Sequence, residues 1–175
     1  MKMSLDELNV NNIDSIRENV EKNSLIIDDI VNSIISPYAS SLDKYVSFIK
    51  DCLKDGENPP TNEELDDFCM NLSTYIYFAS GMTEHLGIRD DIAKAVYKEM
   101  YHTARASQES GTVADKDSLA ELASQEEFIV SAAYTRAYRC MKMKVESAQE
   151  LLQSCKKVLS RRMEEMNLSN ISTYN

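Results

Sequence analysis

Hydrophobic residues recur at three- and four-residue intervals along most of this chain. Near the N-terminus they are Ile13, Ile16, Val20, Ile27, Ile30, Val31 and Ile34. An α-helix turns once every 3.6 residues, so this spacing gathers the side chains on one helical face. The pattern predicts a helix that starts after the capping residues at 12–14. Ser36-Pro37 then predicts a kink or a boundary, because a residue before proline is driven out of the helical conformation.

A second hydrophobic face predicts another helix that ends at Asp55-Gly56. Its members are Leu42, Tyr45, Val46, Ile49 and Leu53. The following segment, GENPPTNEELDD, is the clear linker, because two adjacent prolines stiffen it and Thr61 or Asn62 can cap a new helix. We therefore expect an acidic N-terminal helical arm of residues 1–60 and a helical body of residues 61–175.

The body opens with a hydrophobic stripe over residues 65–82. The stripe consists of Leu65, Phe68, Leu72, Tyr75, Ile76, Ala79 and Met82. The pattern continues with Ile92, Ala95, Val96, Tyr97, Met100 and Thr103. Gly87 lies between the two stretches. Glycine inside a helix costs only about 1 kcal/mol relative to alanine, so Gly87 is compatible with a bend in one helix or with the end of the first.

A polar turn, SQESGTVADKDS, follows Arg105 and predicts a reversal of chain direction. The last predicted helix runs from about 118 to 166. Its stripe has heptad spacing: Met141, Val145, Ala148, Leu152, Cys155 and Leu159. A stripe this long can pair with the helix of residues 65–106, pack against other copies of the chain, or do both. Met141, Val145, Leu152 and Leu159 are accordingly the candidate oligomer seam.

Composition supports an all-α fold. The 175 residues include four glycines and three prolines, far below the usual usage of about 7% and 5%, so the punctuation that sheets and hairpins need is scarce. We expect a long helical hairpin or bundle that carries the N-terminal arm. No apolar run approaches the roughly 18 residues of a membrane span, and the N-terminus has no signal-like apolar segment. These absences favour a cytoplasmic protein without membrane contact.

Charge is distributed unevenly along the chain. The formal net charge is −10. Residues 1–67 hold fifteen acidic and six basic side chains, whereas residues 136–162 hold eight basic and two acidic ones. Such separation predicts an electropositive helix with an anionic partner, beside an acidic arm.

The sequence offers little for catalysis or metal binding. The four cysteines occur singly, and zinc sites require closely paired ligands. A di-iron bundle requires two Glu-x-x-His pairs, and only Glu99 with His102 has that spacing. Acidic pairs that resemble magnesium ligands occur in the arm and at a helix start, where acids also complement the helix dipole: Glu18 with Glu21, and Glu63 with Asp66. We expect no cofactor, no metal and no enzymatic activity.

The basic helix carries the chemistry expected of a polyanion-binding surface. Cations release the counterions condensed on a phosphate backbone, and aromatic rings stack on unpaired bases. The candidate DNA contacts are Arg105, Arg136, Arg139, Lys142, Lys144, Lys156, Lys157, Arg161 and Arg162. The nearest rings are Tyr97, Tyr101, Tyr134 and Tyr138. The alternative interpretation is an ordinary solvated face with the tyrosines in the core.

Residues 68–168 contain the segments NLSTYIYFASGMTEH, TARASQESG, ADKDSL and a closing SRRM, in this order. In this order of segments they resemble the UvsY-type recombination mediators of tailed phages. Arg105 matches a basic residue of that family before the glycine of the turn, where single-stranded DNA is contacted. Thr103 stands where the family has a second basic residue. Ser107 and Gln108 replace its paired tyrosines.

The resemblance implies a non-enzymatic accessory protein that forms a helical homo-oligomer and binds single-stranded DNA. It also implies that the protein helps a recombinase to displace a single-strand-binding protein. A second hypothesis comes from the acidic arm: a phage protein-interaction module, such as an inhibitor of a host-defence nuclease or a virion-assembly adaptor. An acidic helix can imitate nucleic acid and occupy a basic groove.

Overall fold

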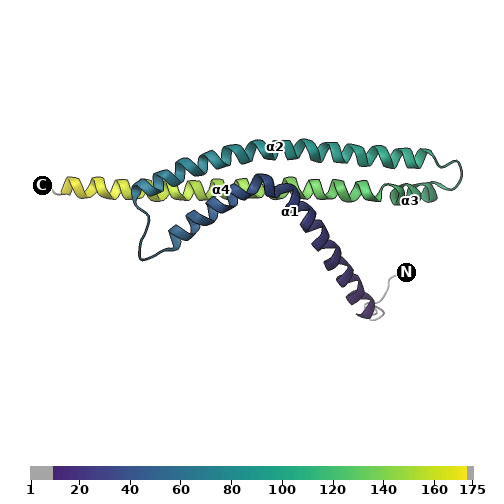
Figure 1. Cartoon of the computed structure of the whole chain (residues 1–175), viewed down its shortest axis with the longest axis horizontal. Helices are drawn as coiled ribbons and strands as arrows, with labels where there is room; N and C mark the ends of the chain where they lie inside the picture. Colours follow the sequence, from purple (N-terminus) through teal and green to yellow (C-terminus); the bar gives the residue numbers. More distant parts are fainter. Residues whose placement is uncertain (1–9, 173–175) are drawn as a thin grey trace.

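A computed structural model describes residues 10–172 and shows four α-helices, with no strand in that range. They are α1 (Val10–Lys54), α2 (Asn62–Ala106), α3 (Val113–Ala123) and α4 (Gln125–Ser172). Helix α2 and the consecutive helices α3 and α4 form a long antiparallel hairpin, and α1 lies across one side of it (Figure 1). The all-α prediction is confirmed.

Helix α1 is one bent helix, although its sequence predicted two hydrophobic stretches separated by a kink or a boundary. Pro37 lies inside it, and the ribbon bends near its middle (Figure 1). Proline has no N–H to donate to the Ser33 carbonyl, and its ring crowds that carbonyl. The Ser40 hydroxyl donates to the Ser36 carbonyl at 2.5 Å. The kink was the correct alternative.

Helix α2 begins at a capping box and continues for 45 residues. Of the two candidate caps, Thr61 is the one used: its side chain accepts from the Glu64 N–H, and the Glu64 carboxylate accepts from the Thr61 N–H at 2.7 Å. Gly87 does not end the helix. A Cβ at this position would lie 3.3 Å from Cε2 of Tyr138, so the glycine allows that ring of α4 to approach the α2 backbone.

The predicted single helix of residues 118–166 is wrong at its start. Helical structure begins at Val113, where Thr112 forms a second capping box with Asp115. It is preceded by a turn in which Gly111 has φ 108°. Ser124 interrupts the helix and separates α3 from α4. Its buried hydroxyl donates to the Ala120 carbonyl at 2.8 Å, and the chain then continues in nearly the same direction (Figure 1).

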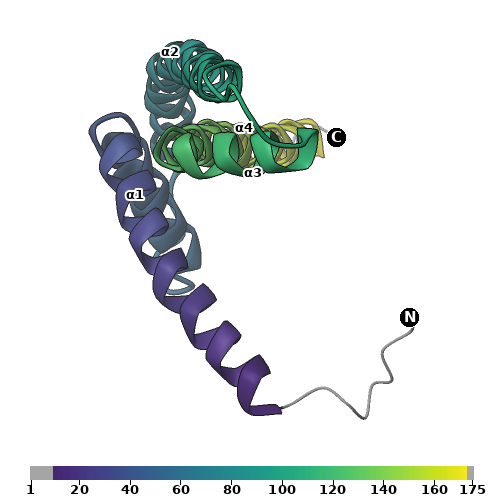
Figure 2. The same cartoon turned by 90° about the vertical axis from the view of Figure 1, so that its right-hand side faces the viewer.

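The hydrophobic core lies where three helices meet. Its buried residues come from α1 (Val31, Ile35, Ala39, Leu42, Ile49), α2 (Leu65, Phe68, Cys69, Leu72, Ile76, Ala79, Leu86) and α4 (Ala133, Ala137, Met141, Val145, Ala148, Leu152, Cys155). The expected arm is therefore divided. Its C-terminal half belongs to the core, whereas its N-terminal half leads away from the hairpin (Figures 1 and 2).

The second half of the predicted α2 stripe is not buried, in contrast to the first half. Ile92, Val96 and Met100 are 58%, 48% and 42% exposed. Here only α2, α3 and the start of α4 are in contact, and small buried residues such as Ala120 and Ser131 line their seam. Two paired helices cover a narrow strip of each other, so the flanking hydrophobic side chains stay accessible.

No helix within residues 10–172 combines the length and the apolar composition required to cross a bilayer.

Candidate nucleic-acid interface

Helix α4 presents most of its basic residues away from the core. Its buried face consists of residues such as Ala137, Met141 and Ala148, which pack against α2 and α1. Cations at positions outside this periodicity point to solvent. The exposed basic residues of α4 are Arg136, Arg139, Lys142, Lys156, Lys157 and Arg161. They form two groups, at 136–144 and 156–162, with Glu146 and Glu150 between them.

Four of these cations have no ion-pair or hydrogen-bond partner within the described part of the chain. They are Arg136, Arg139, Lys156 and Lys157. Exposed, unpaired cations keep their charge available for an external anion. These four side chains are the centre of the candidate interface.

Three other basic residues of α4 form ion pairs at the surface. Lys144 contacts Asp43 of α1 at 2.7 Å, Arg161 contacts Glu165 at 3.1 Å, and Lys142 lies 4.0 Å from Glu146. Exposed pairs of this type contribute about 0.2–1 kcal/mol and exchange readily with other partners. Arg162 instead donates to the buried Pro60 carbonyl at 2.5 Å, which ties α4 to the linker before α2.

Arg105 lies at the opposite end of the hairpin from the 156–162 group. Its Nε is 2.5 Å from Oδ1 of Asp117 in α3, and the Tyr101 hydroxyl donates to the same oxygen at 3.2 Å. Desolvation and this hydrogen bond raise the pKa of Tyr101. Along α3 and α4, Asp117 and Lys156 are separated by roughly 60 Å at 1.5 Å per residue. The structure does not bring Arg105 together with Lys156 and Lys157.

The tyrosines proposed to stack on bases are partly packed within the protein. The Tyr97 ring lies 5.5 Å from that of Phe128, and Tyr138 covers Gly87. Sequence reasoning missed two more accessible rings, Tyr77 and Phe78, which are 76% and 61% exposed. The available signal was their place outside the three- and four-residue spacing of the α2 stripe.

The predicted oligomer seam lies in the interior of one protomer. Met141, Val145 and Leu152 are 0%, 8% and 8% exposed, and Leu159 packs against the same cluster. These side chains fill the interior of one protomer, where α4 meets α2 and α1. The heptad spacing of these residues corresponds to an intramolecular contact. Heptad spacing predicts a helical partner, but it does not specify whether the same chain or another copy supplies it.

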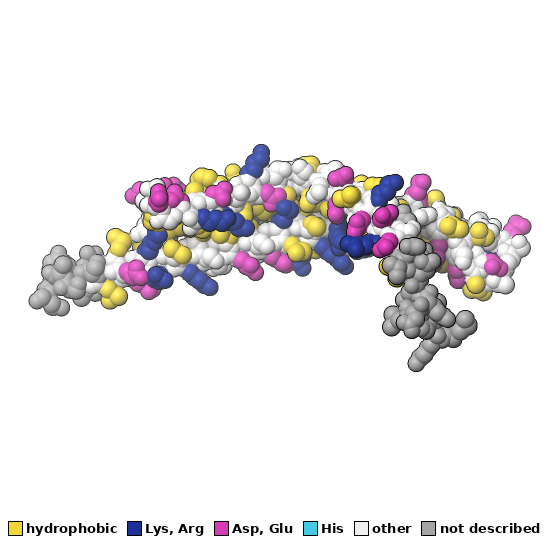
Figure 3. Space-filling model, turned by 90° about the horizontal axis from the view of Figure 1, so that it is seen from below, with side chains coloured by type: hydrophobic (Ala, Val, Ile, Leu, Met, Phe, Trp, Pro, Cys, Tyr) yellow, Lys and Arg dark blue, Asp and Glu magenta, His cyan; other side chains and the backbone are white. Residues whose placement is uncertain are grey.

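Charges of both signs mix along the surface. Figure 3 shows one face, on which groups of Lys and Arg side chains alternate with Asp and Glu side chains along the hairpin. The basic residues of α4 thus form separate groups along an elongated body. Such a surface suits an extended anion that touches several points.

One ionised side chain is buried at the junction between the core and the exposed half of the hairpin. The Asp90 carboxylate is 4% exposed; it accepts from the Thr135 hydroxyl at 2.5 Å and from Lys94 at 2.6 Å. Burial by itself raises the pKa of Asp90, but these hydrogen bonds and nearby cations outweigh it, so that the pKa is lowered.

The remaining titratable groups show no metal centre. Residues 10–172 contain no group of three or more His, Cys, Asp or Glu side chains placed to hold a metal ion. Burial raises the pKa of the Cys69 and Cys155 thiols, which keeps both protonated and unreactive at neutral pH.

A comparison of this chain with protein-family models, curated proteins and solved structures finds no match. Its function has to be argued from its own residues.

Proposed function

We propose that this protein is a non-enzymatic accessory protein that binds single-stranded DNA and acts, as a helical homo-oligomer, as a recombination mediator. In this role it helps a recombinase to displace a single-strand-binding protein and to load onto the DNA. One observation carries the DNA-binding part: Arg136, Arg139, Lys156 and Lys157 are exposed on one helix and unpaired within the described residues.

The spacing of these cations favours a flexible polyanion over a small ligand. Arg136 and Lys157 are separated by roughly 30 Å along α4 at 1.5 Å per residue. Contacts this far apart lie outside the reach of one small anion, whereas a single strand can follow the helix and release counterions at each basic group. The proposed site is therefore a track along α4.

The net charge of −10 opposes tight binding by one copy. Assembly offsets this, because several copies place their basic groups along one strand and each further contact is intramolecular. The resemblance of residues 68–168 to UvsY-type mediators supplies the recombination setting.

Fluorescence anisotropy of a labelled oligonucleotide tests the proposal. Wild-type protein is expected to bind at low salt and to lose affinity as salt rises, because binding releases counterions. Reversing the four unpaired cations, with Arg136→Glu, Arg139→Glu, Lys156→Glu and Lys157→Glu, is expected to weaken binding at least tenfold. Circular dichroism should show unchanged helicity, because all four side chains are exposed.

The matched control reverses four exposed cations elsewhere: Lys44→Glu, Lys50→Glu, Lys54→Glu and Lys98→Glu. It makes the same change in net charge, so a general electrostatic effect weakens binding equally in both variants. Equal losses in the two variants, or no binding by wild type at low salt, contradict the proposal.

The second candidate function, a protein-interaction module, is favoured by the N-terminal half of α1. This segment is acidic and exposes hydrophobic residues. A module of this kind binds its partner through the arm and leaves oligonucleotide anisotropy unchanged, so the same titration separates the two functions.

A further inference from the structure

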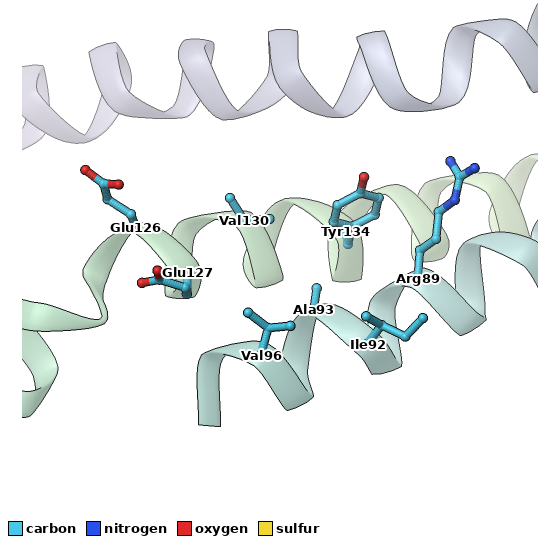
Figure 4. A pocket seen from close by; sticks show the side chains of 8 residues that line it. All are labelled: Arg89, Ile92, Ala93, Val96, Glu126, Glu127, Val130 and Tyr134. Atoms are coloured by element: carbon cyan, nitrogen blue, oxygen red, sulfur yellow. The ribbon is translucent and has the colours of Figure 1, made fainter. Parts of the chain in front are cut away.

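An apolar groove runs between α2 and α4 in the half of the hairpin beyond the core. Ile92, Ala93 and Val96 of α2 and Val130 and Tyr134 of α4 line it (Figure 4). Ile92, Val96 and Val130 are 58%, 48% and 51% exposed. Figure 4 shows these side chains directed toward the side of the hairpin on which α1 runs.

The groove continues an interface that the protein already uses. The C-terminal half of α1 packs on α2 and α4 over the core, and near its bend the Tyr38 hydroxyl lies 3.3 Å from Nη1 of Arg89. Arg89 also lines the groove. The uncovered surface thus begins where α1 leaves the hairpin, and the type of ligand that fits this side is already visible: an amphipathic helix.

The N-terminal half-helix of α1, residues 10–26, is such a helix with an uncovered apolar face. Ile13, Ile16 and Val20 are 45%, 57% and 61% exposed. They occur at the same three- and four-residue spacing as Ile27 and Val31, which pack on the core. One stripe therefore runs through the whole helix, and only its C-terminal part is covered.

The bend at Pro37 keeps this half-helix away from its own groove (Figures 1 and 2). To lie along the groove of its own molecule, α1 would have to straighten through a residue that lacks an N–H and crowds the preceding turn. Proline therefore opposes a straight helix at this position. A groove on another molecule can be reached with the bend retained.

One polar atom indicates what the groove lacks. Oε2 of Glu127, a residue that lines the groove, is shielded from solvent and has no hydrogen-bond partner within the described residues. A buried acceptor without a donor is destabilising, so an occupant that brings a donor is favoured. Beside its apolar stripe the half-helix carries the donor Arg17, which pairs at the surface with Glu21 of its own helix.

We propose that residues 10–26 of one copy dock in the groove between α2 and α4 of a second copy, and that the exchange is reciprocal. In a dimer with two-fold symmetry, each half-helix lies in the groove of the other copy. Both half-helices and both grooves are then covered, and no further copy can add to the contact. The proposal does not require DNA binding, and it replaces the buried stripe of α4 as the surface for self-association.

Light scattering of the full chain without DNA tests this exchange. Wild-type protein is expected at twice the monomer mass of 19.9 kDa. The arm variant Ile16→Asp with Val20→Asp and the groove variant Ile92→Asp with Val96→Asp are each expected at the monomer mass. All four residues are exposed, so neither variant disturbs the core.

Each variant has a matched control with the same change in charge. Ser15→Asp with Ser33→Asp adds two acids to the opposite, exposed side of α1, and Met70→Asp with Tyr77→Asp removes exposed apolar side chains of α2 outside the groove. Both controls are expected to remain dimeric. A monomeric wild type, or a wild-type mass kept by the arm or the groove variant, overturns the proposal.

Mixing distinguishes arm-to-groove docking from contacts between like surfaces. The arm variant keeps an intact groove and the groove variant keeps an intact arm, so a 1:1 mixture is expected to form a mixed dimer held by one contact. An affinity tag on one variant detects the pair. A mixture that stays monomeric at the highest concentration used for wild type overturns the arm-to-groove assignment.

Discussion

Single residues decide where the hairpin is tightly packed and where it is open. Gly87 admits the ring of Tyr138 to the α2 backbone, and three residues later the carboxylate of Asp90 is bound by Thr135 and Lys94. The Asp90–Thr135 bond joins α2 to α4 at one defined height, so it favours a single register of the two helices. Beyond this pair, large hydrophobic side chains of α2 are exposed.

The lowered pKa of Asp90 predicts a pH-dependent contribution to stability. Asp90→Asn is expected to reduce the free energy of unfolding at pH 7 by about 1–3 kcal/mol, because the hydrogen bonds to the ionised carboxylate are lost at a buried site. Since the folded state depresses this pKa, the contribution is present above the unfolded value of about 3.9 and is lost as pH falls through the folded pKa.

Urea unfolding of both proteins at pH 7 and at pH 2 to 4 measures this effect. The gap between wild type and Asp90→Asn should shrink toward the acidic end. Asp91→Asn, at the exposed neighbouring position, is the control and should change the stability by less than about 0.5 kcal/mol. A gap that is the same at all pH values contradicts an ionised role for Asp90.

At the scale of elements, each long helix divides its stripe between partners. The α4 stripe is buried within the protomer. The α2 stripe is buried over its first half, and the α1 stripe is buried in the part that follows the N-terminal half-helix. Periodicity predicted all three stripes. It could not predict the division, because burial depends on the length and position of the elements that pack against each stripe.

Leu152 distinguishes an interior stripe from an oligomer seam. Leu152→Asp is expected to lower the free energy of unfolding by several kcal/mol, because an unpaired charge is placed in the three-helix core. Met143→Asp, on the same helix but at a position that is 65% exposed, is expected to change it by less than about 0.5 kcal/mol. Thermal unfolding followed by circular dichroism compares them. A folded Leu152→Asp protein of lower mass would restore the seam hypothesis.

At the scale of the whole molecule, α1, α2 and α4 build the core, and each of them extends beyond it (Figure 1). Among the side chains of α1 that the structure describes, Val31 is the first buried one, so the preceding segment contributes little to folding of the monomer. The three-helix part supplies the stability. The uncovered half-helix and groove are available for partners.

Truncation separates these two parts. Removing residues 1–24 is expected to shift the melting temperature by only a few degrees, because no core residue is lost. Removing residues 1–45 deletes Val31, Ile35, Ala39 and Leu42 and is expected to unfold the protein at room temperature. Melting should be measured at a dilution at which wild type is monomeric. A large shift with the shorter truncation would assign the half-helix a role in folding.

The sequence predicted which basic side chains are exposed, but it did not predict which of them lie together or form ion pairs. The exposure of Arg136, Arg139 and Lys157 follows from their place outside the α4 stripe. The ion pair of Arg105 with Asp117 depends on how α3 returns against α2, and sequence spacing alone does not contain that contact. The same holds for Lys144, whose partner Asp43 is 101 residues away.

The sequence by itself determined what is local: the helical class, a helix cap at Thr61 or Asn62, and a kink or a boundary at Pro37. These features depend on side chains and backbone groups within a turn of one another. Only the tertiary structure decided which stripes are covered, why Gly87 is tolerated and where the basic groups lie. The hydrophobic effect that drives packing is non-directional, so a stripe states that a partner is needed and leaves the partner to the geometry of the whole chain.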